Sequence, residues 1–455
     1  MPPTAPLAQA AAEHAQRCAR AAASLRASEG AVRLRKSGSN LFRDRGPAPR
    51  QRLDLRDFDH LLAVGPDGAW VEAEAGMSYE ALVDALLPLG LVPTVVPQLK
   101  GITVGGAVAG VGIEASAFRH GLVHDGLLAV ELLLADGERV RCTPDNEHAA
   151  LFRGFPNSYG TLGYALALRL RVRPARPFVT IEHRRFQHPQ AFWAAMAQAC
   201  QDPRLDYVDG VVFGPNCTVL TLAWQVDKVP YCSDYRGAAI YYRSLLKQRF
   251  DHLRLRDWLW RWDTDWFWCS KRFGAENPWV RRLLGPRWLG SRTYQRWMRW
   301  ASRLGINHAG AWWRGRQAES VIQDVDIPIE QADEFLGFLL REVGLLPIWV
   351  CPLVEPPNAA GPWPLYPLQP GRLYLNFGFW GVVEHLQPQA PGALNRRIEA
   401  QTLHAGGLKS LYSESHFARE RFAQLYGGAA YADLKARYDP RQRLPDLYSK
   451  CVLRC

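Results

Sequence analysis

The chain has 455 residues, of which 48% are hydrophobic and 22% charged, and it carries a formal net charge of +11. This composition is typical of a globular protein and excludes a disordered one, while the length predicts two or three domains. The sequence contains neither an apolar run long enough to span a membrane nor the features of a secretory signal. We therefore expect a cytoplasmic protein.

The positive charge favours anionic partners such as nucleic acid, acidic lipid or a phosphorylated cofactor. An Arg-rich surface without a dedicated partner explains the charge equally well. Because the sequence has no nucleic-acid-binding motif and no basic low-complexity tail, we do not expect nucleic acid as a partner. The nine cysteines are scattered, without a C-x-x-C pair or a His/Cys cluster, which predicts reduced thiols and no metal site.

The first 90 residues predict a helix, three strands and a second helix. Residues 5–29 are Ala-rich and helical in pattern, and residues 31–43 predict a short strand that leads into the turn Ser37-Gly38-Ser39-Asn40. The hydroxyls, amide and flexible backbone of this turn suit a diphosphate, although they also suit an ordinary turn. Residues 53–64 and 70–75 predict two strands around a turn. A helix follows, beginning after Ser78 and ending at Gly90.

Residues 103–112, T-V-G-G-A-V-A-G-V-G, predict a glycine-rich loop. A backbone without Cβ atoms can approach a ligand closely, and successive N–H groups can bind a phosphate. An apolar run at 127–135, Asp136-Gly137 and residues 139–141 follow, which predicts a β-hairpin. The hairpin excludes the dinucleotide fingerprint, which requires a helix there, and the loop lacks the Gly-Lys-Ser/Thr of a Walker motif.

A second small-residue loop at 157–164 follows a helix that is expected to open after Thr143-Pro144. An alternating strand at 165–172 completes this unit, and Pro174 and Pro177 mark its boundary. Residues 178–250 then predict the strands and helices of an α+β unit. Strands at 321–328, 346–353 and 372–377 and helices at 393–405 and 416–439 make up the rest.

Residues 258–313 hold eleven of the seventeen tryptophans, and residues 271–316 hold eleven Lys and Arg with only one acidic residue, Glu276. Trp, Arg and Leu together suit the interface of an anionic membrane. An aromatic cap over an apolar pocket, with arginines facing water, fits the same residues, and both interpretations can hold.

Three segments, 103–123, 131–144 and 160–164, resemble the FAD-binding domain of the vanillyl-alcohol-oxidase-type flavoproteins. Within these, the chain looks most like the Δ24-sterol reductases (the diminuto/seladin family). That likeness extends to Gln323-Asp324, to residues 346–352 and to residues 444–451 near the C-terminus. The resemblance covers about residues 31–451.

The resemblance implies an α+β protein with a PCMH-type FAD-binding domain of two subdomains, an antiparallel-sheet cap domain and a C-terminal tail that returns to the FAD domain. The corresponding bounds are 1–30 for an N-terminal helical segment, 31–177 for the FAD-binding domain, 178–405 for the cap with a Trp/Arg-rich insertion at 254–316, and 406–455 for the tail.

The resemblance also implies FAD as the cofactor and NADPH as the electron donor. Members that attach FAD covalently often use a histidine in the first loop, and none occurs in this turn, so we predict non-covalent FAD. The predicted FAD-binding residues are Ser37, Gly38, Ser39, Asn40, Thr103, Val104, Gly105, Gly106, Gly110, Glu114, Ser116, Gly160, Thr161, Gly163 and Tyr164.

The reaction implied is reduction of an isolated C=C bond in an isoprenoid or sterol-like lipid, which needs a hydride and a proton donor. Glu114 and Tyr412 are the candidate catalytic residues, although Glu114 also suits a structural carboxylate bonded to backbone or to Arg119. An FAD-dependent alcohol oxidase or dehydrogenase is the second interpretation, and a non-enzymatic lipid-binding protein the third. The expected partners are an apolar lipid substrate and, through residues 258–316, an anionic membrane surface.

Overall fold

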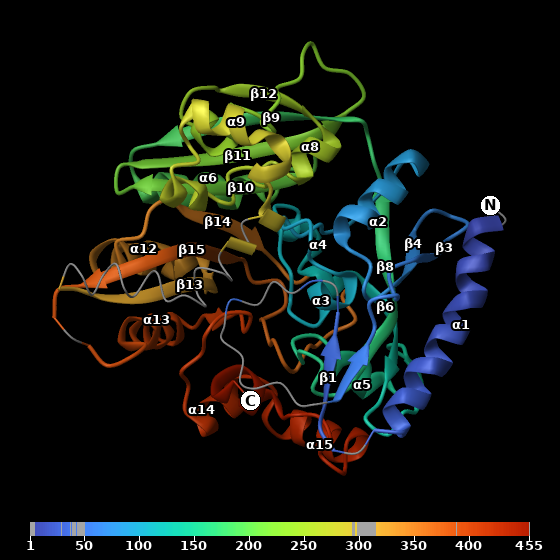
Figure 1. The fold of residues 1–455 in the computed structure, drawn as a ribbon. Coiled ribbons are helices and arrows are strands. Elements are labelled where there is room, and N and C mark those ends of the chain that lie inside the picture. Colours follow the sequence, from blue (N-terminus) through green and yellow to red (C-terminus); the bar gives the residue numbers. More distant parts are fainter. Residues whose placement is uncertain are drawn as a thin grey trace.

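The computed structural model describes the chain except residues 1–4, 29, 37, 39–41, 43–50, 294–295, 298–314, 388 and 455. It is an α+β protein with two large sheets, one in each half of the chain (Figure 1). No helix in the described part of the chain is both long and apolar enough to cross a membrane.

The N-terminal half is built on a six-stranded sheet with the order β3-β4-β8-β6-β7, to which β5 adds by pairing with β8. Its strands pair antiparallel throughout. Their bounds are β3 Leu61–Val64, β4 Trp70–Glu74, β5 Leu91–Pro93, β6 Leu127–Leu133, β7 Arg139–Cys142 and β8 Tyr164–Pro174. A separate parallel pair joins β1 (Val32–Arg35) to β2 (Gln51–Asp54).

Local signals located several elements correctly. The hairpin expected at Asp136-Gly137 is present between β6 and β7, and Gly137 adopts the positive φ (86°) that the turn needs. Helix α2 (Tyr79–Leu86) begins after Ser78, whose Oγ accepts a hydrogen bond from the Ala81 N–H. The short 3₁₀ helix η1 (Leu87–Leu89) then ends at Gly90, with φ 69°.

Four local predictions were wrong. The helix expected to open after Thr143-Pro144 begins only at Ala149, and the helix expected at 416–439 is two helices, Arg419–Leu425 and Gly428–Tyr438. Residues 53–64 do not form one strand but are divided between β2 and β3. The glycine-rich segment is partly helical, because α3 (Val104–Val108) occupies its first half. Thr103 caps this helix by accepting from the Gly106 N–H at 3.2 Å. Gly105 lets the helix approach β4, since a Cβ there would lie 2.8 Å from the Ala75 Cβ. The remaining short helices of this half are α4 (Ala117–His120), η2 (Val123–Gly126) and α5 (Ala149–Gly154).

Helix α1 (Ala5–Arg26) runs along the outer side of the first sheet (Figure 1). One face packs Cys18, Ala21 and Leu25 into a small core. The polar face docks onto the fully buried Glu74, which lies 2.6 Å from His14 Nδ1 and accepts from Arg17 Nε at 2.9 Å.

Two groups around this contact, His14 with Cys18 and Glu131, and Asp59 with His60 and Glu74, have the spacing of metal ligands. Sequence reasoning did not anticipate them, because their members are distant in the chain. The cations His14 and Arg17 already balance the carboxylates of Glu74 and Glu131. These side chains therefore form a buried ion-pair network.

The C-terminal half contains an eight-stranded antiparallel sheet with the order β12-β9-β11-β10-β14-β15-β13-β16. The bounds are β9 Phe178–Phe186, β10 Tyr207–Gly214, β11 Cys217–Val226, β12 Phe250–Arg254, β13 Gln317–Pro328, β14 Ile348–Leu353, β15 Tyr374–His385 and β16 Leu408–Lys409. Helices α6 (Pro189–Ala199), α12 (Ala332–Phe338), which continues as η5 (Leu339–Val343), and α13 (Ala393–His404) share a core with one face of this sheet.

The opposite face of this sheet packs against the Trp-rich segment and the N-terminal half in one continuous core. Helix α7 (Tyr241–Ser244) precedes this segment. The segment at 254–316 contains α8 (Leu255–Leu259), η3 (Cys269–Phe273) and the kinked α9 (Pro278–Leu289). Trp258, Trp260, Trp262, Trp266 and Trp268 are all buried. The first half of the segment thus forms an aromatic layer between the two halves of the chain.

The tail returns to the N-terminal half, as expected. It contains α14 (Arg419–Leu425), α15 (Gly428–Tyr438) and η6 (Ser449–Leu453). Lys435 Nζ donates to the Thr161 carbonyl at 2.8 Å, and Lys450 Nζ donates to the Tyr159 carbonyl at 2.6 Å. Strand β16, which precedes these helices, pairs with β13 and so also joins the tail to the second sheet.

Candidate active site

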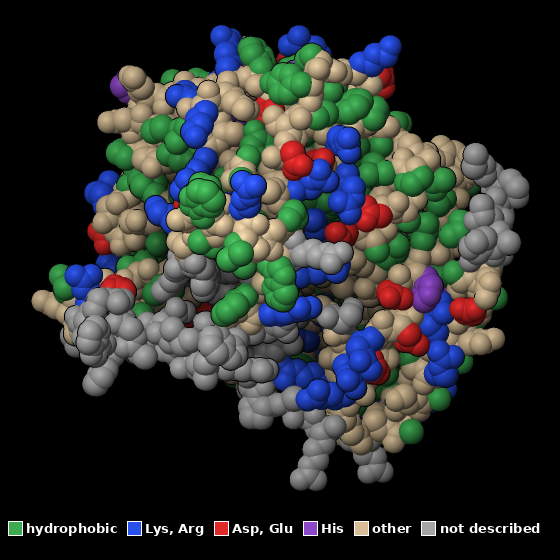
Figure 2. All heavy atoms as spheres, turned by 45° about the horizontal axis from the view of Figure 1, so that its top comes forward, with side chains coloured by type: hydrophobic (Ala, Val, Ile, Leu, Met, Phe, Trp, Pro, Cys, Tyr) green, Lys and Arg blue, Asp and Glu red, His purple; other side chains and the backbone are tan. Residues whose placement is uncertain are grey.

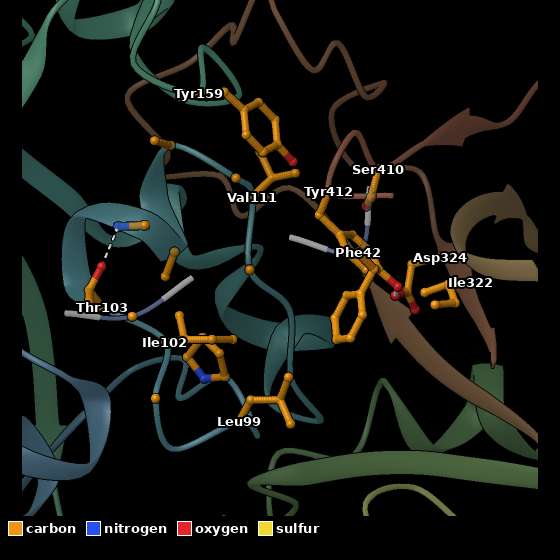
Figure 3. Close-up of a pocket in the computed structure, with 18 of the residues that line it drawn as sticks. Phe42, Leu99, Ile102, Thr103, Val111, Tyr159, Ile322, Asp324, Ser410 and Tyr412 are labelled. Carbon is orange, nitrogen blue, oxygen red and sulfur yellow. Dashed lines mark hydrogen bonds between the residues drawn. The ribbon is translucent and has the colours of Figure 1, made fainter. Parts of the chain in front are cut away.

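A cavity of about 1640 Å³ extends between the two halves of the chain. At one end it is lined by backbone of the two glycine-containing segments, and at the other by aromatic side chains of the second sheet and the Trp-rich segment. Figure 3 shows the region where Thr103, Val111 and Tyr159 from the first half approach Asp324 and Tyr412.

The glycine end joins the two loops predicted from the sequence. Tyr159 N donates to the Ala109 carbonyl at 3.1 Å, so the second loop is bonded directly to the segment that follows α3. Gly160 and Gly163 have φ of 75° and 143°, which L-residues rarely adopt. This end of the cavity therefore has a wall made mostly of backbone.

Most of the predicted FAD-binding residues that the structure describes line this cavity. They are Gly38, Thr103, Gly105, Gly106, Gly110, Gly160, Gly163 and Tyr164. Val104, Ser116 and Thr161 do not line it. Val104 is fully buried in the core, Ser116 Oγ donates to the Thr94 carbonyl, and Thr161 Oγ1 donates to the Ser158 carbonyl. Ser37, Ser39 and Asn40 lie outside the described residues.

The described lining carries a strong positive charge. Its basic residues are Arg33, Lys36, Lys271, Arg443, Lys450 and Arg454, and its single acidic residue is Asp324. Cationic side chains beside a wall of glycine backbone favour a diphosphate. The residues present therefore fit FAD in their charge, their glycine backbone and the size of the space.

Three aromatic residues in succession, Trp266, Phe267 and Trp268, form part of the opposite end. All three have left-handed backbone with φ between 50° and 55°, which is strained for bulky residues and requires support from packing. Phe267 stacks on Trp262 at 5.2 Å between ring centroids and lies 4.9 Å from the Trp380 ring. The result is an apolar chamber beside the glycine end.

Tyr412 lines the cavity next to Phe42 and Asp324 (Figure 3). Its hydroxyl donates to Asp324 Oδ2 and accepts from Trp380 Nε1 at 2.9 Å. The Tyr412 carbonyl accepts from Phe42 N at 3.0 Å, and the two rings meet edge to face. Tyr412 is thus fixed on one side by the cap sheet and on the other by the first predicted loop.

Asp324 is the one buried acid of this cavity among the residues described. Burial raises the pKa of Asp324 to about 8, and the nearby Asp326 adds to that rise, while the bond from Tyr412 opposes it. Burial and Asp324 together raise the pKa of Tyr412 well above its usual value. At neutral pH both groups therefore hold their protons, and the pair can donate a proton rather than accept one.

Glu114 does not line the cavity. It is buried with Arg261, whose Nη1 donates to Glu114 Oε1 at 2.8 Å and whose Nη2 donates to Asp209 Oδ2 at 2.6 Å. Burial raises the pKa of Glu114 to about 7, an effect that Arg261 opposes. The alternative partner Arg119 donates instead to the carbonyls of Asp202 and Pro203. Glu114 joins the FAD-domain loop to the Trp-rich segment in this structure.

Sequence reasoning missed Asp324 and Trp380 as site residues. Asp324 lies in a strand that contains several other polar residues, so the sequence offered no clear signal for it. What brings the two residues together is sheet register, because Asp324 pairs with Gly378 on β15, two residues before Trp380. A Cβ at Gly378 would lie 2.6 Å from Asp324 Oδ1, so this glycine makes room for the carboxyl group.

Comparison with known proteins supports FAD as the ligand of this cavity. A family model described as an FAD binding domain matches residues 6–143. The chain is 27% identical to the Delta(24)-sterol reductase of Macaca fascicularis over 407 residues, covering 86% of this chain and 75% of the relative. The human Delta(24)-sterol reductase gives the same identity and coverage. The Arabidopsis thaliana Delta(24)-sterol reductase is 26% identical over 434 residues, covering 85% of this chain and 74% of the relative.

The fold, the glycine-lined cationic cavity and the matched domain define an FAD-dependent oxidoreductase. Residues 6–143 match the FAD binding domain model, and over most of its length the chain is similar to the Δ24-sterol reductases.

Proposed function

We propose that this protein reduces a C=C bond in an isoprenoid or sterol-like lipid, with NADPH as the electron donor. The observation that carries the proposal is the Tyr412–Asp324 pair, which is protonated at neutral pH beside an apolar chamber. Similarity to the Δ24-sterol reductases supports this choice of reaction.

When bound, FAD supplies a two-electron hydride carrier. The protein must then position the lipid and deliver a proton. Trp266, Phe267 and Trp380 line the chamber and would hold an apolar chain while excluding water. Tyr412 lines the cavity. Once its hydroxyl turned away from Asp324, it would donate its proton to one alkene carbon, and the protonated Asp324 would then donate a proton back to Tyr412. Burial also keeps water from competing for this proton.

The competing reaction, oxidation of an alcohol, requires a group that removes a proton. A carboxyl group whose pKa is raised to about 8 is a poor base below that pH, so the pair favours reduction. The basic lining offers partners for the phosphates of NADPH, which we propose reaches the flavin through the same cavity.

Anaerobic mixing of the flavin-loaded protein with NADPH tests the proposal. We expect NADPH to bleach the absorbance of the oxidised flavin, and a sterol with a side-chain double bond to restore it. Bleaching by an alcohol but not by NADPH would instead identify an oxidase or dehydrogenase. Failure of the purified protein to take up flavin at all would point to a lipid-binding protein.

A further inference from the structure

Helix α9 presents an unusual concentration of apolar side chains to solvent. Of the eleven large hydrophobic residues that are exposed in the described part of the chain, five lie between residues 279 and 297. Trp279 is 77% exposed, Leu283 is 88% exposed and Trp288 is 59% exposed, and Leu284 and Trp297 complete the group. Because exposed apolar clusters of this kind mark interaction surfaces, α9 requires a partner.

The helix is firmly attached by its other side. Asn277 Oδ1 accepts from the Trp279 N–H at 2.9 Å and caps the first turn. Arg281 is buried and donates to the carbonyls of Gly237 and Thr264, and Leu289 is fully buried. The exposed apolar residues therefore lie on the outer side of an anchored element.

The same region is cationic. Between residues 277 and 318 the sequence has nine arginines and no acidic residue. Arg282 is exposed next to Leu283, and Lys271 is exposed where η3 leads into α9. Figure 2, in which the top of Figure 1 is turned forward, shows Lys and Arg side chains interspersed with hydrophobic ones on this face. Indole and leucine side chains next to cations match the headgroup region of an anionic bilayer.

The cationic character also argues against a second copy of the chain as the occupant. A two-fold dimer would place the same surface of each copy against the other, so the exposed cations Lys271, Arg282 and Arg296 of one copy would face those of the other. A bilayer containing acidic lipids has the complementary charge and accepts the indole rings.

We propose that α9 docks this protein on the surface of an anionic lipid bilayer, beside the mouth of the cavity. Residues 266–269 and Lys271 line the cavity, and α9 begins a few residues further on, at Pro278. Two further cavity-lining residues, Leu346 and Leu453, are themselves exposed and apolar. The inference rests on the proposed function, because docking at this place would let a membrane lipid enter the chamber without crossing water.

Sedimentation with lipid vesicles tests the docking. We expect the flavin-loaded protein to sediment with vesicles of phosphatidylcholine mixed with phosphatidylglycerol, and less so as salt is raised. The double substitution Trp279→Ser/Leu283→Ser should weaken this binding by about 10-fold or more. The control Leu89→Ser/Leu386→Ser removes two exposed leucines from outside this region and should bind like the unchanged protein.

Equal vesicle binding by the two double variants would overturn the proposal, as would binding that does not depend on phosphatidylglycerol. If Trp279→Ser/Leu283→Ser converts a dimer to a monomer in analytical ultracentrifugation and leaves vesicle binding unchanged, the surface is an interface between copies. Reduction of the flavin by NADPH and of a detergent-solubilised lipid is measured separately. If only the docking proposal is wrong, both activities should still be observed. If the proposed function is wrong, they should be absent.

Discussion

At the scale of single residues, Tyr412 and Asp324 carry the proposed chemistry. We expect Tyr412→Phe and Asp324→Asn to lower the rate of lipid reduction by about 100-fold or more, the usual contribution of a positioned acid. Both variants keep the shape of the side chain, so flavin binding and flavin reduction by NADPH should change little. Stopped-flow measurement of the two half-reactions separates these effects.

Tyr374→Phe is the matched control for these substitutions. Tyr374 is also a buried tyrosine of the cap sheet, but it does not line the cavity, and its hydroxyl accepts from the Gln369 N–H. Removal of the Tyr374 hydroxyl should leave the rate of lipid reduction unchanged. Equal losses in Tyr374→Phe and Tyr412→Phe would show that Tyr412 acts only through the packing of the sheet.

The pH dependence follows from the same carboxyl group. Burial raises the pKa of Asp324 from 3.8 to about 8, and the charged groups facing it are Asp326, which raises it further, and Lys409, which lowers it. The proton that Asp324 supplies to Tyr412 is thus present below pH 8 and is lost as the pH rises through about 8. We expect the rate of lipid reduction to fall above pH 8, and Asp324→Asn to remove this limb of the profile.

The stability of the folded protein should also decrease as the pH rises. Between about pH 4 and pH 8 the folded protein holds a proton on Asp324 that the unfolded chain releases, so the free energy of unfolding contributed by this group decreases as the pH rises. Denaturant titrations of the unchanged protein and Asp324→Asn across that range would detect it. A rate profile in Asp324→Asn that still falls at pH 8 would assign the titration to another group.

At the scale of elements, the sequence predicted the helices and turns that are defined by capping or turn residues. It failed where contacts with other parts of the chain determine the structure. Ser78 and Gly90 delimit α2, and Asp136-Gly137 forms its hairpin, because capping and turn geometry depend on neighbouring residues. The segment at 103–112 was predicted as a loop from its glycines. It begins as a helix because Thr103 caps it and its small residues pack against Ala75.

The sequence analysis named Glu114 beside Tyr412 as a candidate proton donor because Glu114 is close in the chain to the glycine-rich segment. Glu114 follows the glycine segment directly, but the structure buries it against Arg261, 147 residues away. We therefore expect Glu114→Gln to act mainly on stability. It should lower the free energy of unfolding by about 3 kcal/mol, at the lower end for a broken buried ion pair because Asp209 still pairs with Arg261.

Thermal and denaturant unfolding of Glu114→Gln would measure this loss. Asp84→Asn is the matched control, since Asp84 forms an exposed ion pair with Arg256 between the same two halves of the chain and should affect unfolding much less. The folded fraction of Glu114→Gln should reduce lipid at a rate within a few-fold of the unchanged protein. A 100-fold loss of rate with unchanged stability would restore Glu114 as a catalytic candidate.

At the scale of the whole molecule, the resemblance predicted two domains and a returning tail, and the structure has both. It could not predict how these parts form one site, because the contacts join residues that are far apart in the chain. Asp324 meets Tyr412 only because β16 brings the tail to β13, where Ser410 N donates to the Asp324 carbonyl at 3.0 Å. Trp380 reaches the same point through the pairing of β13 with β15.

The tail also holds the glycine end of the cavity, which gives a prediction for cofactor affinity. Lys435 is largely buried, and its ammonium group donates to the Thr161 carbonyl in the second loop, to Asp439 Oδ2 at 2.6 Å and to the Leu444 carbonyl. Lys435→Met would leave the Asp439 carboxylate without this partner and release the loop that carries Gly160 and Gly163. We expect the dissociation constant for FAD to rise about 10-fold, the equivalent of losing roughly 1.4 kcal/mol of binding free energy.

Flavin fluorescence during titration of the apoprotein would measure this change. Arg441→Met is the control, because Arg441 is an exposed cation in the same part of the tail and its loss should leave FAD affinity unchanged. Lys435→Met should weaken FAD binding more than it slows lipid reduction at saturating FAD, since its contacts reach the loop and not Tyr412. If the two variants bind FAD equally well, the glycine end keeps its shape without the tail, and the returning segment serves only to position Tyr412.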